Sequence, residues 1–383
     1  MDIQRIPLSL YVHWPWCVRK CPYCDFNSHA LPDAHETIAE RYVDALIADL
    51  DTSIELASDR TLQSIFIGGG TPSLMSPTQL ERFLEHVAKR YRLANDIEIT
   101  MEANPGTIEH GHFGDYRACG INRLSMGIQT FNDSLLKRLG RIHDQRQALL
   151  AIETVQKHFD NFNLDVMYAL PGQSIEMLRE DLRRAIDARS THLSFYQLTI
   201  EPNTVFAKYE PKDLPDEDTI AIMQETVVST LADAGFDHYE ISGYAKPGHR
   251  CRHNLNYWQF GDYLGAGAGA HSKITLENGT ILRQARYSQP TSFMQHALND
   301  SAVAEKHTVE AEDLPFEFML NALRLHDGVA LETFEQRTGL ALETIMPIVE
   351  KAQKQGLMPY PLTAIVATEM GQNFLSDLQE YFL

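Results

Sequence analysis

Three cysteines near the N-terminus, Cys17, Cys21 and Cys24, lie at a C-x3-C-x2-C spacing. A loop this short can carry three thiolates around one face of a small inorganic centre, and thiolates are ligands of zinc sites and iron–sulfur clusters. A four-iron cluster normally takes four thiolates, but the position two residues after Cys24 is Phe26. Three ligands leave one iron with an open coordination position, which can bind a second molecule. The spacing therefore predicts a cluster with one exchangeable site.

Structural zinc is the alternative for the same thiols, with His13 or His29 as the fourth ligand. Structural zinc sites usually combine C-x2-C pairs that a longer loop separates. The observed spacing favours an iron–sulfur cluster. A plain binding protein with zinc in the cysteine loop stays open until metal analysis is done.

Short apolar or β-branched runs recur in the first half of the chain and predict strands that alternate with helices. Ser76 and Asp144 stand before helical apolar patterns as expected capping residues. Six strand–helix units in a row predict an α/β fold with parallel strands, either an open doubly wound sheet or a barrel. The predicted strands cover residues 8–14, 64–67, 97–102, 123–129, 163–169 and 192–198.

Polar residues near the ends of these strands favour the barrel. The cysteine loop follows the first strand, and a triple glycine, residues 68–70, follows the second. Glu102 and Gln129 end the third and fourth strands, and Asp165 lies within the fifth. In parallel α/β folds, ligands gather at the carboxyl ends of the strands. We therefore expect a partial (β/α)6 barrel of the TIM type with one working rim.

The composition describes an acidic globular protein. The chain has 383 residues and a formal net charge of −19, which argues against binding to nucleic acid or to an anionic membrane. Five cysteines, three of them clustered, indicate metal ligands in a reducing compartment rather than disulfides. The chain shows neither a signal-peptide core nor a run of 18 apolar residues, so we expect a cytoplasmic protein without a membrane span.

The chain divides into three expected parts. Residues 1–245 form the barrel, residues 246–304 a connecting segment, and residues 305–383 a smaller C-terminal cover domain. A seventh strand is expected at residues 239–244. In the last part, helices at 315–325, 331–338 and 342–355, a hairpin at 358–368 and a helix at 371–382 resemble a winged helix. Residues 310–383 carry four Lys and Arg against twelve Asp and Glu, so DNA binding is not expected.

The cysteine motif, with Tyr23 before its last cysteine and a strand ahead of it, resembles that of the radical S-adenosylmethionine (SAM) superfamily. The resemblance implies a [4Fe–4S] cluster whose open iron is chelated by the amino and carboxylate groups of SAM. It further implies that the reduced cluster can donate one electron to the sulfonium, which yields a 5′-deoxyadenosyl radical.

A closer resemblance is to the oxygen-independent coproporphyrinogen oxidase group. It lies in YVHWPWC at 11–17, GGGTP at 68–72, MGIQT at 126–130 and LPG at 170–172. It implies that Glu102 accepts from the methionine ammonium, Asp165 from ribose hydroxyls, and that Arg141 pairs with the carboxylate. A structural ion pair between Arg141 and Asp165 is the alternative. The implied SAM site comprises Tyr11, Tyr23, Gly69, Gly70, Thr71, Glu102, Gln129, Arg141 and Asp165.

Two departures point to the haem-chaperone (HemW-type) branch of this group. Phe26 replaces a further cysteine, and the segment ahead of Tyr11 is short. The branch carries a His-Asn-x-x-Tyr-Trp motif, present at 253–258 as HNLNYW. His253 can ligate haem iron while Tyr257 and Trp258 pack on the macrocycle; a surface histidine is the alternative.

The expected function is therefore haem binding and delivery to apo-haemoproteins, including respiratory ones. The alternatives are a coproporphyrinogen oxidase, which decarboxylates propionate side chains, and a radical SAM methyltransferase. Cys119 and Cys251 are expected to be buried cysteines, and c-type haem attachment is not supported because C-x-x-C-H is absent. A homodimer and a peripheral membrane contact stay open.

Overall fold

A computed structural model describes residues 2–57, 59–106, 112–299 and 301–383. In these residues, twelve strands form one sheet in the order β14-β13-β12-β11-β1-β4-β5-β6-β7-β8-β10-β9. The six predicted strands lie side by side in chain order and are all parallel. They are β1 (Leu8–Trp14), β4 (Thr61–Gly69), β5 (Arg92–Ala103), β6 (Arg123–Gln129), β7 (Phe162–Tyr168) and β8 (His192–Gln197). This confirms the predicted α/β core.

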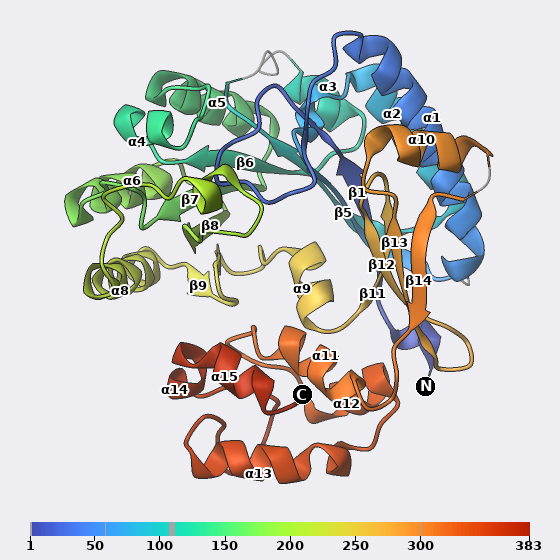
Figure 1. Ribbon diagram of the computed structural model, residues 1–383, viewed down its shortest axis with the longest axis vertical. Helices are drawn as coiled ribbons and strands as arrows, with labels where there is room; N and C mark the ends of the chain where they lie inside the picture. Colours follow the sequence, from blue (N-terminus) through green and yellow to red (C-terminus); the bar gives the residue numbers. More distant parts are fainter. Residues whose placement is uncertain (1, 58, 107–111, 300) are drawn as a thin grey trace.

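Helices cover the outer side of these strands, whereas the C-terminal helices lie across the opening on the other side (Figure 1). Ser76 and Asp144 cap their helices through complete capping boxes, as predicted. The outer helices are α1 (His35–Ser53), α2 (Pro77–Arg90), α3 (Phe113–Ala118), α4 (Asp133–Arg138), α5 (Gln145–His158), α6 (Ile175–Asp187) and α8 (Glu217–Asp233). Because β1 and β8 pair with other strands and not with each other, the barrel stays open.

The predicted connecting segment extends the sheet. After α9 (Arg252–Trp258), strand β11 (Asp262–Ala266) pairs in parallel with β1. Strands β12 (His271–Thr275), β13 (Ile281–Arg286) and β14 (Val303–Thr308) then continue the sheet in antiparallel fashion, and α10 (Pro290–Asn299) packs beside α1. The sheet therefore contains strands from both sides of the predicted boundary at 245/246, and β14 crosses the predicted boundary at 304/305.

Buried ion pairs fix this extension to the barrel. The carboxylate of Asp262 on β11 accepts from Arg60 at 2.7 Å and from Lys273 on β12 at 2.9 Å. Asp49 on α1 pairs with Arg286 on β13 at 3.2 Å. All of these side chains are buried, so each charge depends on its partner.

The strand predicted at 239–244 is wrong. The chain instead forms β9 (Asp237–His238) and β10 (Gly243–Ala245), an antiparallel pair. The buried Glu240 side chain accepts from Ser242 at 3.3 Å in the turn between them.

The C-terminal part packs around its own apolar core. Its helices are α11 (Leu314–Ala322), α12 (Leu331–Thr338), α13 (Met346–Lys354), α14 (Glu369–Asn373) and α15 (Leu375–Glu380). The predicted hairpin at 358–368 is wrong: the described chain forms one bridge there, between Val329 and Ile365. Pro359 and Pro361 lack the N–H groups that a ladder needs. The last helix divides into two at Phe374.

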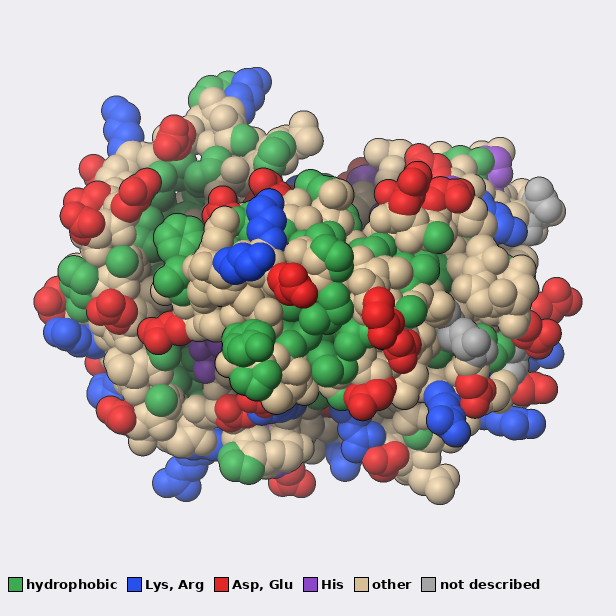
Figure 2. Space-filling view, turned by 90° about the horizontal axis from the view of Figure 1, so that it is seen from below, with side chains coloured by type: hydrophobic (Ala, Val, Ile, Leu, Met, Phe, Trp, Pro, Cys, Tyr) green, Lys and Arg blue, Asp and Glu red, His purple; other side chains and the backbone are tan. Residues whose placement is uncertain are grey.

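The face that the C-terminal part presents is mixed in character. Seen from below, hydrophobic side chains gather in its middle and Asp and Glu side chains lie around them (Figure 2). Leu320, Met370 and Phe374 are among the exposed apolar residues of this part. Among the helices of the described residues, none is long and apolar enough to cross a membrane.

Candidate functional site

The cysteine loop lies over a cavity of about 350 Å³ at the carboxyl ends of the parallel strands. A short parallel pair, β2 (Trp16–Cys17) with β3 (His29–Ala30), closes the base of the loop. Eleven of the twelve residues predicted for the cluster and SAM line this cavity. They are Cys17, Cys21, Tyr23, Cys24, Gly69, Gly70, Thr71, Glu102, Gln129, Arg141 and Asp165.

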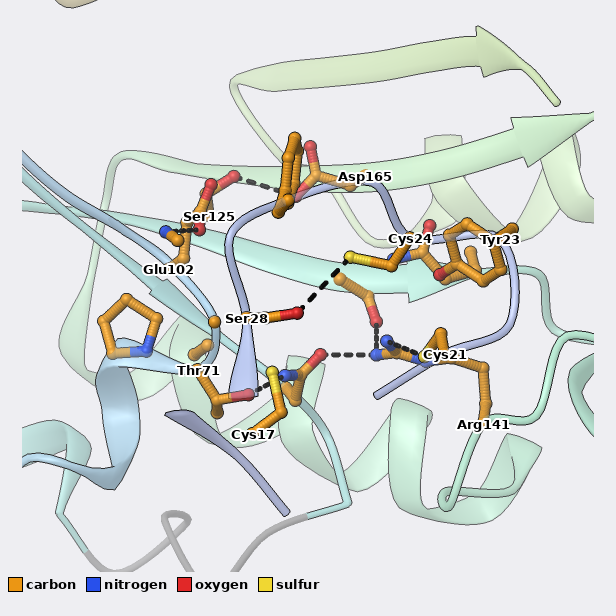
Figure 3. A pocket seen from close by; sticks show the side chains of 18 of the residues that line it. Cys17, Cys21, Tyr23, Cys24, Ser28, Thr71, Glu102, Ser125, Arg141 and Asp165 are labelled. Atoms are coloured by element: carbon orange, nitrogen blue, oxygen red, sulfur yellow. Dashed lines mark hydrogen bonds between the residues drawn. The ribbon is translucent and has the colours of Figure 1, made fainter. Parts of the chain in front are cut away.

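The three thiols are free and half-buried. In Figure 3 the sulfurs of Cys17 and Cys24 point into the pocket, and Cys21 lies beside Arg141. Burial raises the pKa values of Cys17 and Cys24, although hydrogen bonds to Thr71 and Ser28 oppose this effect. Burial therefore favours the thiol forms of Cys17 and Cys24, and a bound metal must displace their protons.

The thiols do not preform a site for a single ion. Among the described residues, no group of three or more His, Cys, Asp or Glu side chains is arranged to hold one metal ion. All three cysteines instead line the shared cavity.

Two carboxyl groups, Glu102 and Asp165, lie in the cavity, and neither forms an ion pair within the described part of the chain, although the charge of Arg123 acts on Asp165. The Oε2 atom of Glu102 accepts from the amide of Gly69 at 3.0 Å. Burial, and next the charge of Asp165, raise the pKa of Glu102 to about 8. Burial also raises the pKa of Asp165, although Ser125 and Asn163 donate to it at 2.9 and 2.8 Å. The cavity therefore offers acceptors that suit an ammonium group and hydroxyls.

Arg141 is one of two arginines that line the cavity, together with Arg19. It donates to the Sγ atom of Cys21 at 3.6 Å, to the carbonyl of Gly127 at 2.8 Å and to Asn104. Its Nε atom is buried and has no hydrogen-bond partner, so a donor is left for an anionic ligand. The alternative of a structural ion pair is wrong, since Asp165 accepts from Ser125 and Asn163 instead.

The glycine turn needs its glycines because the backbone is crowded. Gly69 has φ +115°, and a Cβ atom there would lie 2.5 Å from the ring of His13. A Cβ atom on Gly70 would lie 2.6 Å from the carbonyl oxygen of Trp16. The turn can approach the cysteine loop this closely only without side chains.

Asn104 and Tyr196 are among the polar lining residues that sequence reasoning missed. Asn104 donates to the Thr71 hydroxyl at 2.9 Å and also contacts Arg141. The Tyr196 hydroxyl donates to Gln129 at 2.7 Å. The position of Asn104, just past the end of β5, was the available signal; Tyr196 gave none, because aromatic residues are common in strands.

Tyr11 lies beside the cavity but not among its lining residues. Its hydroxyl contacts the Nδ1 atom of His13 at 2.9 Å. Its ring stacks on Phe66, with centroids 6.3 Å apart, and on His253, with centroids 6.1 Å apart. Tyr11 therefore stands between the cavity and the helix that carries the predicted haem motif.

The haem motif forms α9, which packs on β1, β4 and β11. His253 is 3% exposed, so the alternative of a surface histidine is wrong. Its ring stacks on Phe66 at 4.8 Å and meets the edge of Tyr257 at 4.7 Å, and its buried Nδ1 atom has no hydrogen-bond partner. Burial, assisted by Arg123, lowers the pKa of His253 to about 3, so the imidazole is neutral.

The neighbours of His253 anchor the helix on both sides. The carboxylate of Glu98 on β5 accepts from the amides of Arg252 and His253 at 3.0 and 3.4 Å. Trp258 packs against the C-terminal core, where Arg324 lies 4.3 Å over its ring. Cys251 is buried, as predicted, whereas the same prediction for Cys119 is wrong, since that side chain is only half-buried.

Comparisons with known proteins agree with this geometry. A family model of the radical SAM superfamily matches residues 11–185, and one of the HemN C-terminal domain matches residues 309–359. The chain is 48% identical to heme chaperone HemW of Escherichia coli over 382 residues, which covers 100% of this chain and 99% of that protein. It is 33% identical to heme chaperone HemW of Bacillus subtilis, with coverage of 98% and 99%.

Among solved structures, the fold is similar to that of the coproporphyrinogen III oxidase HemN of Escherichia coli. The TM-score is 0.83 with 23% identity, over 99% of this chain and 90% of that one. At this identity, the likeness bears on the fold alone.

Proposed function

The chain belongs to the HemW family of the radical SAM superfamily, and from this premise we propose that it is a haem chaperone. It binds a [4Fe–4S] cluster, SAM and haem, and it passes the haem to apo-haemoproteins, including those of respiration. The observation that carries the proposal is His253, a buried, neutral imidazole with an unpartnered nitrogen in an intact family motif. A neutral imidazole is the form that ligates haem iron.

The residues of the cavity fit the cluster and SAM. Cys17, Cys21 and Cys24 hold three irons of the cluster. Glu102 and Arg141 orient the amino and carboxylate groups of SAM, because both side chains line the cavity and Arg141 keeps an unpartnered donor. When bound, the reduced cluster supplies one electron to the sulfonium of SAM.

Haem reaches His253 only after α9 moves. The ring lies between Phe66 and Tyr257 and is almost fully buried, so the described arrangement is closed around the imidazole. Haem binding draws the imidazole out of this stack, and Tyr257 and Trp258 become available to pack on the macrocycle.

The test is a haem titration of the anaerobically reconstituted protein. Wild type is expected to hold about four irons per chain and to give a shifted Soret band with haem. His253→Ala loses the band shift. His249→Ala is the matched control, since it removes a half-buried histidine four positions earlier. A band shift that survives His253→Ala, or catalytic formation of protoporphyrinogen in an anaerobic assay, contradicts the proposal.

A further inference from the structure

The proposed haem ligand and the SAM cavity are joined by two aromatic side chains, Tyr11 and Phe66. Tyr11 on β1 stacks on His253 and on Phe66, which itself stacks on His253. A Cβ atom on Gly68 would lie 2.8 Å from the Phe66 ring and 3.2 Å from Glu102. The stack therefore reaches the wall of the cavity, and a movement of His253 removes one of the rings that hold Tyr11.

The hydroxyl group of Tyr11 contacts the ring of His13. Its Nε2 atom lies 2.8 Å from the carbonyl oxygen of Asn27, which can only accept, so Nε2 carries the proton. Nδ1 is then an acceptor, and the Tyr11 hydroxyl donates to it at 2.9 Å. Burial lowers the pKa of His13 and keeps this neutral form. The ring also fills the space beside Gly69 of the glycine turn.

Asn27 fixes the end of the cysteine loop. Its side-chain amide donates to the carbonyls of Ala268 and Ser288 at 2.9 and 2.8 Å, both in the extension of the sheet. The backbone carbonyl of the same residue is the acceptor of His13. A continuous set of contacts thus runs from His253 through Tyr11 and His13 to the loop that carries the cysteines.

We propose that His13 and Tyr11 are positioning residues that couple the haem and SAM sites, so that SAM binding favours release of haem. The inference rests on the proposed function, in which His253 must leave the stack to ligate haem. When His253 leaves the stack, Tyr11 loses one of the rings that it packs on. The position of His13, and with it the contacts of His13 with Asn27 and Gly69, is then less well fixed. SAM needs this loop and turn in place, so SAM stabilises the closed form with His253 in the stack. By linkage, haem weakens SAM binding by the same factor.

The experiment measures haem affinity of the cluster-loaded protein with and without saturating SAM, with the cluster left oxidised. Wild type is expected to bind haem about fivefold or more weakly in the presence of SAM, and SAM by the same factor more weakly in the presence of haem. His13→Gln and Tyr11→Phe bring this ratio close to one. If His13 and Tyr11 had a purely structural role, the substitutions would change the affinities for haem and for SAM. The ratio of the haem affinities with and without SAM would then stay as in wild type.

His29→Gln is the matched control, because His29 also contacts Asn27, through its side chain at 3.1 Å, but lies outside the set of contacts to Tyr11. His29→Gln is expected to keep the wild-type ratio of the haem affinities measured with and without SAM. If haem and SAM bind independently in wild type, or if haem binds more tightly with SAM, the inferred coupling is wrong. The proposed haem-chaperone function is not affected by this result. A Soret band that does not depend on His253 overturns the proposed function and the inference with it.

Discussion

SAM binding is expected to displace a proton from Glu102. The pKa of this carboxyl is raised to about 8 because the side chain is buried and lies near Asp165. At pH 7 a group with this pKa is about 0.9 protonated. The ionised form pairs with the amino group of SAM, so SAM binding shifts Glu102 to the carboxylate. The expected contribution of Glu102 is therefore about 0.9 proton released per SAM at pH 7.

Calorimetry in buffers of different ionisation enthalpy measures this quantity on the oxidised, cluster-loaded protein. The amino group of SAM can release a proton of its own, so the informative value is the difference between wild type and Glu102→Gln. Glu98→Gln is the matched control: Glu98 lies four residues earlier on β5, on the same face of the strand, but accepts from the amides of α9. It keeps the wild-type proton release.

The raised pKa of Glu102 also makes the stability of the SAM-free protein depend on pH. A carboxyl whose pKa is higher in the folded than in the unfolded chain stabilises the fold at low pH, and this contribution is lost as pH rises from 4.5 toward about 8. Glu102→Gln is expected to flatten the decline of the unfolding free energy over this window. Equal proton release by wild type and Glu102→Gln would refute the assignment of Glu102 to the SAM amino group.

Three further predictions concern the cluster, the turn and the fold. Cys17→Ala is expected to lose most of the bound iron and Cys119→Ala to retain it, as iron and sulfide analysis would show; equal iron contents contradict the ligand assignment. Gly70→Ala is expected to weaken SAM binding at least tenfold, about 1.4 kcal/mol, because its Cβ atom would meet a backbone carbonyl at 2.6 Å. Asp262→Asn is expected to lower the urea unfolding free energy by about 3–5 kcal/mol, since it leaves two buried cations uncompensated. Asp44→Asn, in an exposed pair, should cost less than about 1 kcal/mol, and a similar cost at both positions would contradict the argument.

The core and the rim of the barrel were predictable because their signals are local. Strands β1 and β6 have the predicted bounds, since a buried strand reads as a continuous or alternating apolar run. The rim residues follow from the rule that carboxyl ends of parallel strands share an edge. Cys17, Glu102 and Asp165 are far apart in the chain, yet they face one cavity.

Other features depend on contacts that no local pattern announces. Strand β11 pairs with β1 although some 250 residues separate them, and its sequence, DYLGA, contains no β-branched residue and gave no strand signal. The burial of His253 depends on Phe66, a residue of β4. The prediction of a hairpin at 358–368 was wrong although a local signal against it was present. Pro359 and Pro361 lack N–H groups, and this outweighs the β-branched residues that follow.

The position of α9 gives a physical reason to separate haem handling from radical chemistry on a porphyrin. Helix α9 lies against β1 and β4, on the face to which Tyr11 and Phe66 project. Its N-terminus is tied to Glu98 and its end to the C-terminal core. Helix α9 therefore lies between these strands and the C-terminal core, and it carries the imidazole that the proposed function assigns to haem iron. Under the proposed function, haem is therefore held at α9, outside the cavity that the cluster and SAM would occupy, since no residue of α9 lines that cavity.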